Sequence, residues 1–315
     1  MAGTPQAQPL VFSSSAELVR VVVSVTDAFG RPISGLRRDD FVIKDGGKKR
    51  AVATIAECSQ RGGETASDCQ ADLVLLLDTS RSMNPVLELA RDEALAFADS
   101  VPETRMRRVV SFESTVKIWP GEGAQLKETL DRILTERRGS GTRLLEAVTQ
   151  SVELVESDPS PRPILVALTD GEDTEGSLLR RAAMRQWTAR ELRDDLRHLK
   201  GRKPEEIAQQ LQRSAVAFYA ISFARTLPAG NRQKSAQKAL QALAGASGGL
   251  VVDGSAENLG PQFAQIRADL SSQYVLGFVP APSAKGGLLR TLKIEVRGRA
   301  ARVRHRATYA ARGAR

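Results

Sequence analysis

Three short polar segments carry side chains that could bind a metal ion together. The first, Asp78 to Ser82, begins at the last residue of the apolar run DLVLLLD. The second is the turn Gly139-Ser140-Gly141, which leads into Thr142, and the third, Asp170 to Asp173, follows PILVALT. The candidate ligands are three hydroxyls and two carboxylates: Ser80, Ser82, Thr142, Asp78 and Asp170. A set of oxygen ligands without imidazole or thiolate suits Mg²⁺, or Mn²⁺ or Ca²⁺, better than zinc or copper.

Each segment also has an ordinary structural interpretation. A Ser or Asp after a strand commonly caps a helix, and Asp-Gly commonly forms a turn. The three segments nevertheless occur in one chain, each beside a predicted strand end or helix start. In a doubly wound sheet such loops converge on one crevice, so we expect a single cation site. Glu172 and Asp173 are expected to be solvated loop charges, one of which could hydrogen-bond to a ligand.

The elements that would position these loops alternate between strand and helix from residue 71 to residue 271. Continuous apolar runs such as DLVLLLD are typical of strands buried on both faces of a parallel sheet. Helical patterns are expected at residues 86–100, 124–137, 142–156, 176–213, 231–246 and 257–271. This order predicts an α/β fold: a doubly wound, mostly parallel, Rossmann-like sheet with helices on both faces.

Both ends of the chain are expected to be β structure, apart from a disordered lead-in at residues 1–15. Residues 16–57 read as a small β module and residues 58–70 as a linker. Residues 272–310 contain a strand, SQYVLGFVP, and two alternating segments expected to form a hairpin turning near Gly298. Because one hairpin is too small to fold alone, we expect it to pack on the N-terminal module as a small β-sandwich.

The positive charge is concentrated at the C-terminus. The 315-residue chain has a net charge of +9, and nine basic residues against one acid give residues 290–315 a charge of +8. We expect this tail to line the solvent face of the hairpin, with a weak electrostatic role toward anionic surfaces as the alternative. The remainder is nearly neutral, so nucleic-acid binding is not expected.

Several enzyme classes and targeting signals are missing from the sequence. The only histidines are His198 and His305, and there is no HExxH motif, phosphate-binding loop, nucleophile elbow or dinucleotide fingerprint. No apolar run is long enough to cross a bilayer, and no signal peptide is recognisable. Either a cytoplasmic start or a removed signal fits this N-terminus.

Two cysteines, Cys58 and Cys69, lie in the polar stretch ECSQRGGETASDCQ. A disulfide between them would stabilise a short loop in an oxidising compartment. The alternative is a pair of free thiols in an exposed connector.

The motifs DTSRS, the glycine-rich turn with Thr142, and LTDGED together resemble the metal-ion-dependent adhesion site of von Willebrand factor type A domains. The flanking segments resemble bacterial "VWFA-related" proteins of the Acidobacteria type, which usually carry secretion signals. This resemblance implies that Ser80, Ser82 and Thr142 ligate the ion directly, and that Asp78 and Asp170 act largely through water. The sixth position would accept an Asp or Glu of a partner protein.

Two features depart from the pattern of that family. Arg81 stands where many relatives have Gly, and it is either a harmless exposed side chain or one that influences an acidic partner. The charged segment at residues 177–213 is longer than usual; a solvated helical insertion is the default, and Met184 and Trp187 are candidates for an exposed contact.

The sequence therefore predicts a non-enzymatic, metal-dependent, adhesion-type protein-binding module that is periplasmic or secreted. The motifs contain no general base or positioned nucleophile for hydrolysis. An intracellular scaffold in a multiprotein assembly and, less favoured, a Mg²⁺-dependent hydrolase are the alternatives. Neither the partner nor the oligomeric state follows from the sequence.

Overall fold

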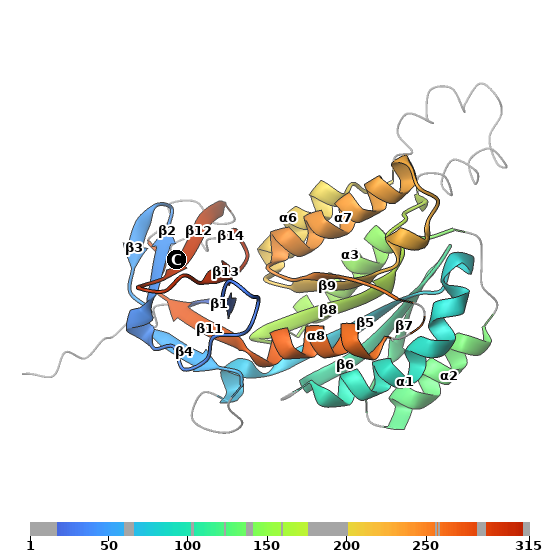
Figure 1. Cartoon of the computed structure of the whole chain (residues 1–315), viewed down its shortest axis with the longest axis horizontal. Coiled ribbons are helices and arrows are strands. Elements are labelled where there is room, and N and C mark those ends of the chain that lie inside the picture. The colour runs from blue at the N-terminus through green and yellow to red at the C-terminus, as the bar shows by residue number, and fades with distance from the viewer. Residues whose placement is uncertain are drawn as a thin grey trace, which may run out of the picture.

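The computed structural model describes residues 18–59, 66–101, 104–122, 124–136, 141–158, 160–175, 201–255, 257, 259–281 and 288–310. Within these ranges the chain forms one six-stranded sheet and two four-stranded sheets (Figure 1). The large sheet lies among helices, and the two smaller sheets lie together at one end of it.

The six-stranded sheet has the order β10-β9-β8-β5-β6-β7, and all its pairs are parallel except β6 with β7. Every residue of β5 and β8, its two central strands, is buried because helices cover both faces. The strands are β5 (Ala71–Asp78), β6 (Thr104–Phe112), β7 (Val116–Pro120), β8 (Arg162–Thr169), β9 (Ala217–Ser222) and β10 (Val251–Asp253).

The helices divide between the two faces of this sheet (Figure 1). Helices α1 (Asn84–Ser100), α2 (Ala124–Thr135) and α8 (Gly260–Ser271) share one apolar core with it. On the other face lie α3 (Leu144–Glu156), α6 (Pro204–Ser214) and α7 (Asn231–Ser247). The predicted fold class is therefore confirmed. Of the helix expected at 176–213, α6 is the part inside the described residues; Met184, Trp187 and His198 lie outside them.

The two smaller sheets combine strands from both ends of the chain. One has the order β13-β1-β11-β4 and the other β14-β12-β2-β3, and they share a single hydrophobic core. Their strands are β1 (Val19–Thr26), β2 (Phe41–Asp45), β3 (Lys48–Arg50), β4 (Thr54–Glu57), β11 (Gln273–Phe278), β12 (Leu289–Val296), β13 (Arg302–Arg304) and β14 (Thr308–Ala310). The C-terminal strands thus pack on the N-terminal ones, as predicted; we call this unit the β module.

The predicted C-terminal hairpin is confirmed only for the end of its second segment, β14, which pairs antiparallel with β12. Although the chain turns at Gly298, which has a φ of 64°, the segment after it does not pair along its length with β12. Instead β13 pairs with β1 in one sheet and β14 pairs with β12 in the other. The chain crosses between the two sheets because the apolar faces of both sheets need to be covered. The alternation of apolar and polar residues in the sequence does not specify which sheet a strand joins.

The prediction that the basic tail lines a solvent face is wrong for three arginines. Arg290 contacts the buried carboxylate of Asp45, with 2.9 Å between Nη2 and Oδ2. Arg306 is buried and donates a 2.8 Å hydrogen bond to the carbonyl of Arg20. Arg304 forms an ion pair with Asp269 at the end of α8. These three arginines therefore hold the β module together and fasten it to α8, whereas Lys293, Arg297, Arg299 and Arg302 are exposed.

The junction between the β module and the large sheet is polar and buried. Arg162, the first residue of β8, is fully buried and donates to the carbonyl of Leu270 over 2.8 Å. Burial lowers the pKa of Arg162 to about 10. The hydroxyl of Tyr219 donates to Asp269 over 2.8 Å. Gln273, the first residue of β11, connects the β module to these groups: it donates to the Tyr219 hydroxyl over 2.6 Å and accepts from Arg162 over 3.3 Å. The β module is thus attached at the amino ends of the parallel strands, away from the loops that follow their carboxyl ends.

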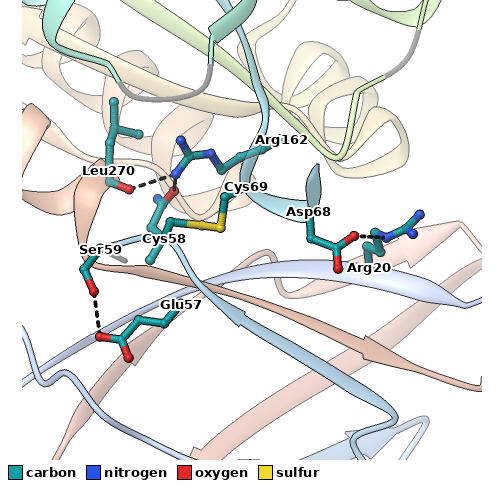
Figure 2. Close-up of a disulfide and its surroundings, with 9 residues drawn as sticks. Arg20, Glu57, Cys58, Ser59, Asp68, Cys69, Arg162 and Leu270 are labelled. Carbon is teal, nitrogen blue, oxygen red and sulfur yellow. Dashed lines mark hydrogen bonds and ion pairs between the residues drawn. A yellow bond between two sulfur atoms is a disulfide. The ribbon is translucent and has the colours of Figure 1, made fainter. Parts of the chain in front are cut away.

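Cys58, directly after β4, and Cys69, at the end of the 3₁₀ turn Ala66–Cys69 that precedes β5, form a disulfide (Figure 2). Both cysteines are buried with Ala56 and Val275, in contrast to the exposed connector suggested by the sequence. Figure 2 also shows Arg162 beside this disulfide. In the part of the chain that is described, no helix is both long enough and apolar enough to span a membrane.

We expect reduction of the disulfide to lower the free energy of unfolding by about 3 kcal/mol, because a cross-link restricts the unfolded chain. Denaturant unfolding with and without a thiol reductant measures this difference. The double variant Cys58→Ser and Cys69→Ser is the control and should be insensitive to the reductant. Superimposable curves for the oxidised and reduced wild type would contradict the expectation.

Candidate metal centre

Asp78 is the last residue of β5 and, with Asp170, the most buried of the predicted ligands. Its side chain is fully buried. Oδ1 accepts a 3.0 Å bond from the amide of Ser80, and Oδ2 accepts a 2.7 Å bond from the hydroxyl of Thr169. Both carboxylate oxygens are therefore oriented by hydrogen bonds from neighbouring loop and strand residues.

The two predicted serine ligands lie in the tight turn that joins β5 to α1. Residues Arg81–Met83 form a 3₁₀ turn, closed by a 3.0 Å bond from the Met83 amide to the Ser80 carbonyl. This turn places the hydroxyl oxygens of Ser80 and Ser82 3.1 Å apart. Ser80 is buried whereas Ser82 and Arg81 are exposed, so this side of the centre is accessible to solvent.

Asp170 reaches the same point from the neighbouring strand. Strands β5 and β8 are parallel, with Leu77 opposite Leu168, so the residues that follow them emerge side by side. The hydroxyl of Ser82 donates to Oδ2 of Asp170 over 2.6 Å. The three oxygen-bearing side chains of Ser80, Ser82 and Asp170 thus form a contiguous cluster.

Gly171 lets the chain turn immediately after Asp170. Its φ of 79° is unfavourable for residues with a side chain. A Cβ atom there would lie 2.9 Å from Cδ1 of Leu240 in α7. The Asp-Gly pair therefore allows the Asp170 loop to lie close against α7.

Thr142 is attached to the far end of the Asp170 loop. Its amide donates to the hydroxyl of Thr174 over 2.7 Å, and the amide of Thr174 donates to the Thr142 carbonyl over 2.7 Å. Thr142 itself is buried. Gly141 precedes it with a φ of 138°, while Gly139 and Ser140 of the predicted turn lie outside the described residues. The loop from Asp170 to Glu175 thus connects all three predicted segments.

Glu172 and Asp173 have defined partners, unlike the solvated charges expected from the sequence. Glu172 makes a two-point ion pair with Arg232 of α7, at 2.6 and 2.8 Å. Asp173 accepts a 2.9 Å bond from the amide of Leu145 in the first turn of α3. Burial raises the pKa of Asp173. Both acids fasten the loop to neighbouring helices.

The electrostatics of the centre favour a cation. Burial, together with the nearby charge of Asp170, raises the pKa of Asp78 to about 7. Two buried carboxylates so close together repel each other, and a divalent ion between them would offset that repulsion. The residues present therefore fit a hard cation: an all-oxygen set that is buried on one side and open to solvent at Ser82.

No group of three or more His, Cys, Asp or Glu side chains is arranged as a metal cluster among the residues described. A cation at this edge of the sheet would therefore depend on serine and threonine hydroxyls as well as on Asp78 and Asp170. Neutral hydroxyls leave a divalent ion with more of its charge uncompensated than carboxylates would.

Comparison with protein families identifies the segment that carries these side chains. Residues 73–172 match the model of the von Willebrand factor type A domain. The chain contains a von Willebrand factor type A domain. The matched range includes all five predicted ligands: Asp78, Ser80, Ser82, Thr142 and Asp170.

Several solved structures resemble the chain at low sequence identity. Proximal thread matrix protein 1 from the mussel byssus is 16% identical with a TM-score of 0.45; the match covers 66% of this chain and 48% of that one, so the chain spans about half its length. A von Willebrand factor type A protein from Catenulispora acidiphila is 12% identical, with a TM-score of 0.45 and coverage of 94% and 75%. The pilus adhesin SpaC from Lactobacillus rhamnosus GG is 11% identical, with a TM-score of 0.48 and coverage of 90% and 48%. A search of curated proteins finds no match.

Three residues that organise the centre of the type A domain were not identified from the sequence: Thr169, Thr174 and Glu175. Thr169 is the last residue of β8; besides its bond to Asp78, its hydroxyl accepts a 3.0 Å bond from the amide of Gly171. A single Thr ending an apolar run looks like any strand residue. Its role depends on the register between β5 and β8, which the run of residues does not specify.

We expect Thr169→Val to lower the free energy of unfolding by about 1–3 kcal/mol, because it removes the hydrogen bonds that Thr169 makes with Oδ2 of the buried Asp78 and with the Gly171 amide. Denaturant unfolding in EDTA measures this loss. Thr169→Ser keeps the hydroxyl and should stay close to the wild type. If the Val variant were as stable as the Ser variant, these two bonds would be shown to contribute little.

Proposed function

We propose that the chain is a non-enzymatic protein-binding module that holds a divalent cation, Mg²⁺ in the first place, at the carboxyl edge of its large sheet. The observation that carries this proposal is the contiguous oxygen cluster of Ser80, Ser82 and Asp170, with spacings of 3.1 and 2.6 Å. Ser80, Ser82 and Thr142 would hold the ion directly. Asp78, whose oxygens already accept two bonds, would act through water together with Asp170.

The partner in this proposal is a protein that presents an Asp or Glu. A cation held mainly by neutral hydroxyls retains its attraction for an anionic ligand. Ser82 and Arg81 are exposed, which leaves room for a partner side chain to approach. Arg81 adds a positive charge beside that approach. The bound ion would complete its coordination with the partner carboxylate, so binding would depend on the cation.

We further propose that the protein works in an oxidising compartment, either the periplasm or outside the cell. The buried disulfide between Cys58 and Cys69 supports this location because such bonds persist there and are rare in the cytosol.

We expect Mg²⁺ or Mn²⁺ to raise the melting temperature, because a ligand that binds only the native state stabilises it. Asp170→Ala and Ser80→Ala should each abolish this rise, whereas Ser255→Ala, in the loop after β10, should retain it. Thermal unfolding with added chloride salts against EDTA provides the measurement. The same rise in Asp170→Ala as in wild type would disprove the site.

The partner-binding part of the proposal calls for affinity capture from a lysate of the source organism. Proteins retained by the wild type in Mg²⁺ should be lost in EDTA and should be absent with Asp170→Ala. Capture that is equal with and without EDTA would count against a cation-mediated contact.

A further inference from the structure

Glu175 is a buried acid at the end of the Asp170 loop, and the proposed cation does not need it as a ligand. Its side chain is only 3% exposed. Oε2 accepts a 2.8 Å bond from the amide of Arg202, and Oε1 forms an ion pair with the guanidinium of the same residue. A second guanidinium, that of Arg143, donates to Oε1 over 3.2 Å. A buried carboxylate with these contacts holds several backbone segments together.

The bond to Arg143 belongs to a series between the Asp170 loop and the start of α3. Asp173 binds Leu145, Thr174 binds Thr142, and Glu175 binds Arg143. The three successive loop residues thus hold three of the four residues from 142 to 145. Thr142, the predicted ligand, lies at the end of this series and is directly bonded to Arg143 in the chain.

The bond to Arg202 joins two positions that are distant in sequence. Glu175 and Arg202 stand on either side of residues 176–201, so the carboxylate holds both flanks of that segment at one point beside Thr142. Arg202 also lies just before α6, which packs on the same face of the sheet as α3. The contact therefore connects α6 with the loop that carries Asp170.

The charged groups around Glu175 favour the ionised form of its carboxylate. Burial would raise its pKa, but the Arg202 amide and the guanidinium groups of Arg202 and Arg143 hold it below the usual value. Arg143 also pairs with Glu146 in the first turn of α3. The side chains of Arg202, Glu175, Arg143 and Glu146 thus form a continuous series of ion pairs between two acids and two bases.

We propose that Glu175 is a positioning residue of the metal centre: it fixes Arg143 and Arg202 so that Thr142 stays where it can hold the cation. This inference rests on the proposed function, because it concerns the affinity of that same site. It adds that cation binding is coupled to Arg202 and, through it, to the start of α6. A partner that pulls Arg202 away from Glu175 would weaken the hold on the ion.

The test is a calorimetric titration of the full chain with MgCl₂ and with MnCl₂. We expect Glu175→Ala to raise the dissociation constant about 10-fold, as is common when groups that orient a metal ligand are removed. Arg202→Ala should raise it less, because Arg143 still contacts the carboxylate. This second variant keeps Glu175 and provides the measurement if Glu175→Ala fails to fold.

Asp45→Asn is the matched control. Asp45 is likewise a buried carboxylate that contacts two arginines, Arg50 and Arg290, but it lies in the β module. The variant Asp45→Asn should lower the melting temperature in EDTA without changing the dissociation constant for Mg²⁺. A purely structural Glu175 would behave in the same way, so an unchanged dissociation constant in Arg202→Ala and in any folded Glu175→Ala would overturn the inference.

Asp170→Ala separates this inference from the proposed function. If the wild type binds Mg²⁺ and Asp170→Ala does not, the site stands and the Glu175 and Arg202 variants decide the inference. If Asp170→Ala binds Mg²⁺ as tightly as the wild type, the ion lies elsewhere and the proposed site fails before Glu175 is considered.

Discussion

The repulsion between two buried carboxylates is the constraint around which this end of the molecule is built. Asp78 and Asp170 follow adjacent parallel strands, so the sheet itself brings them together. Burial, together with the charge of Asp170, raises the pKa of Asp78, and hydroxyl and amide donors surround the two side chains. Such an arrangement is costly in an empty protein interior and favourable beside a cation. The neighbouring loops hold these donors in place.

The loop from Asp170 to Glu175 makes most of the contacts that hold these donors in place. It contacts the β5–α1 turn through Ser82, α7 through Arg232, and the start of α3 through a series of backbone and side-chain bonds. The loop therefore connects helices that otherwise meet only through the apolar core. A structural change at one of these contacts would therefore reach the oxygen cluster through hydrogen bonds and ion pairs, which are directional, rather than through apolar packing.

The β module lies at the opposite edge of the large sheet and is stabilised by a different set of interactions. Its two sheets are assembled from the ends of the chain, and arginines of the C-terminal segment provide buried bonds within it and to α8. Three of the arginines that look like surface charges in the sequence, Arg290, Arg304 and Arg306, thus have structural roles. The module leaves the carboxyl edge of the large sheet free, where the cluster opens to solvent.

The sequence by itself determined the α/β class, the joining of the two chain ends and the five candidate ligands, because buried runs and polar strand ends are local patterns. Tertiary structure alone decided the strand crossing after Gly298, the ion pairs of Arg290 and Arg304, the burial of Arg306, and the roles of Thr169 and Glu175. Each of these depends on which distant backbone lies opposite a residue. Local periodicity records whether a side chain is apolar or charged, but a buried charge is stable only through partners that the folded chain brings to it.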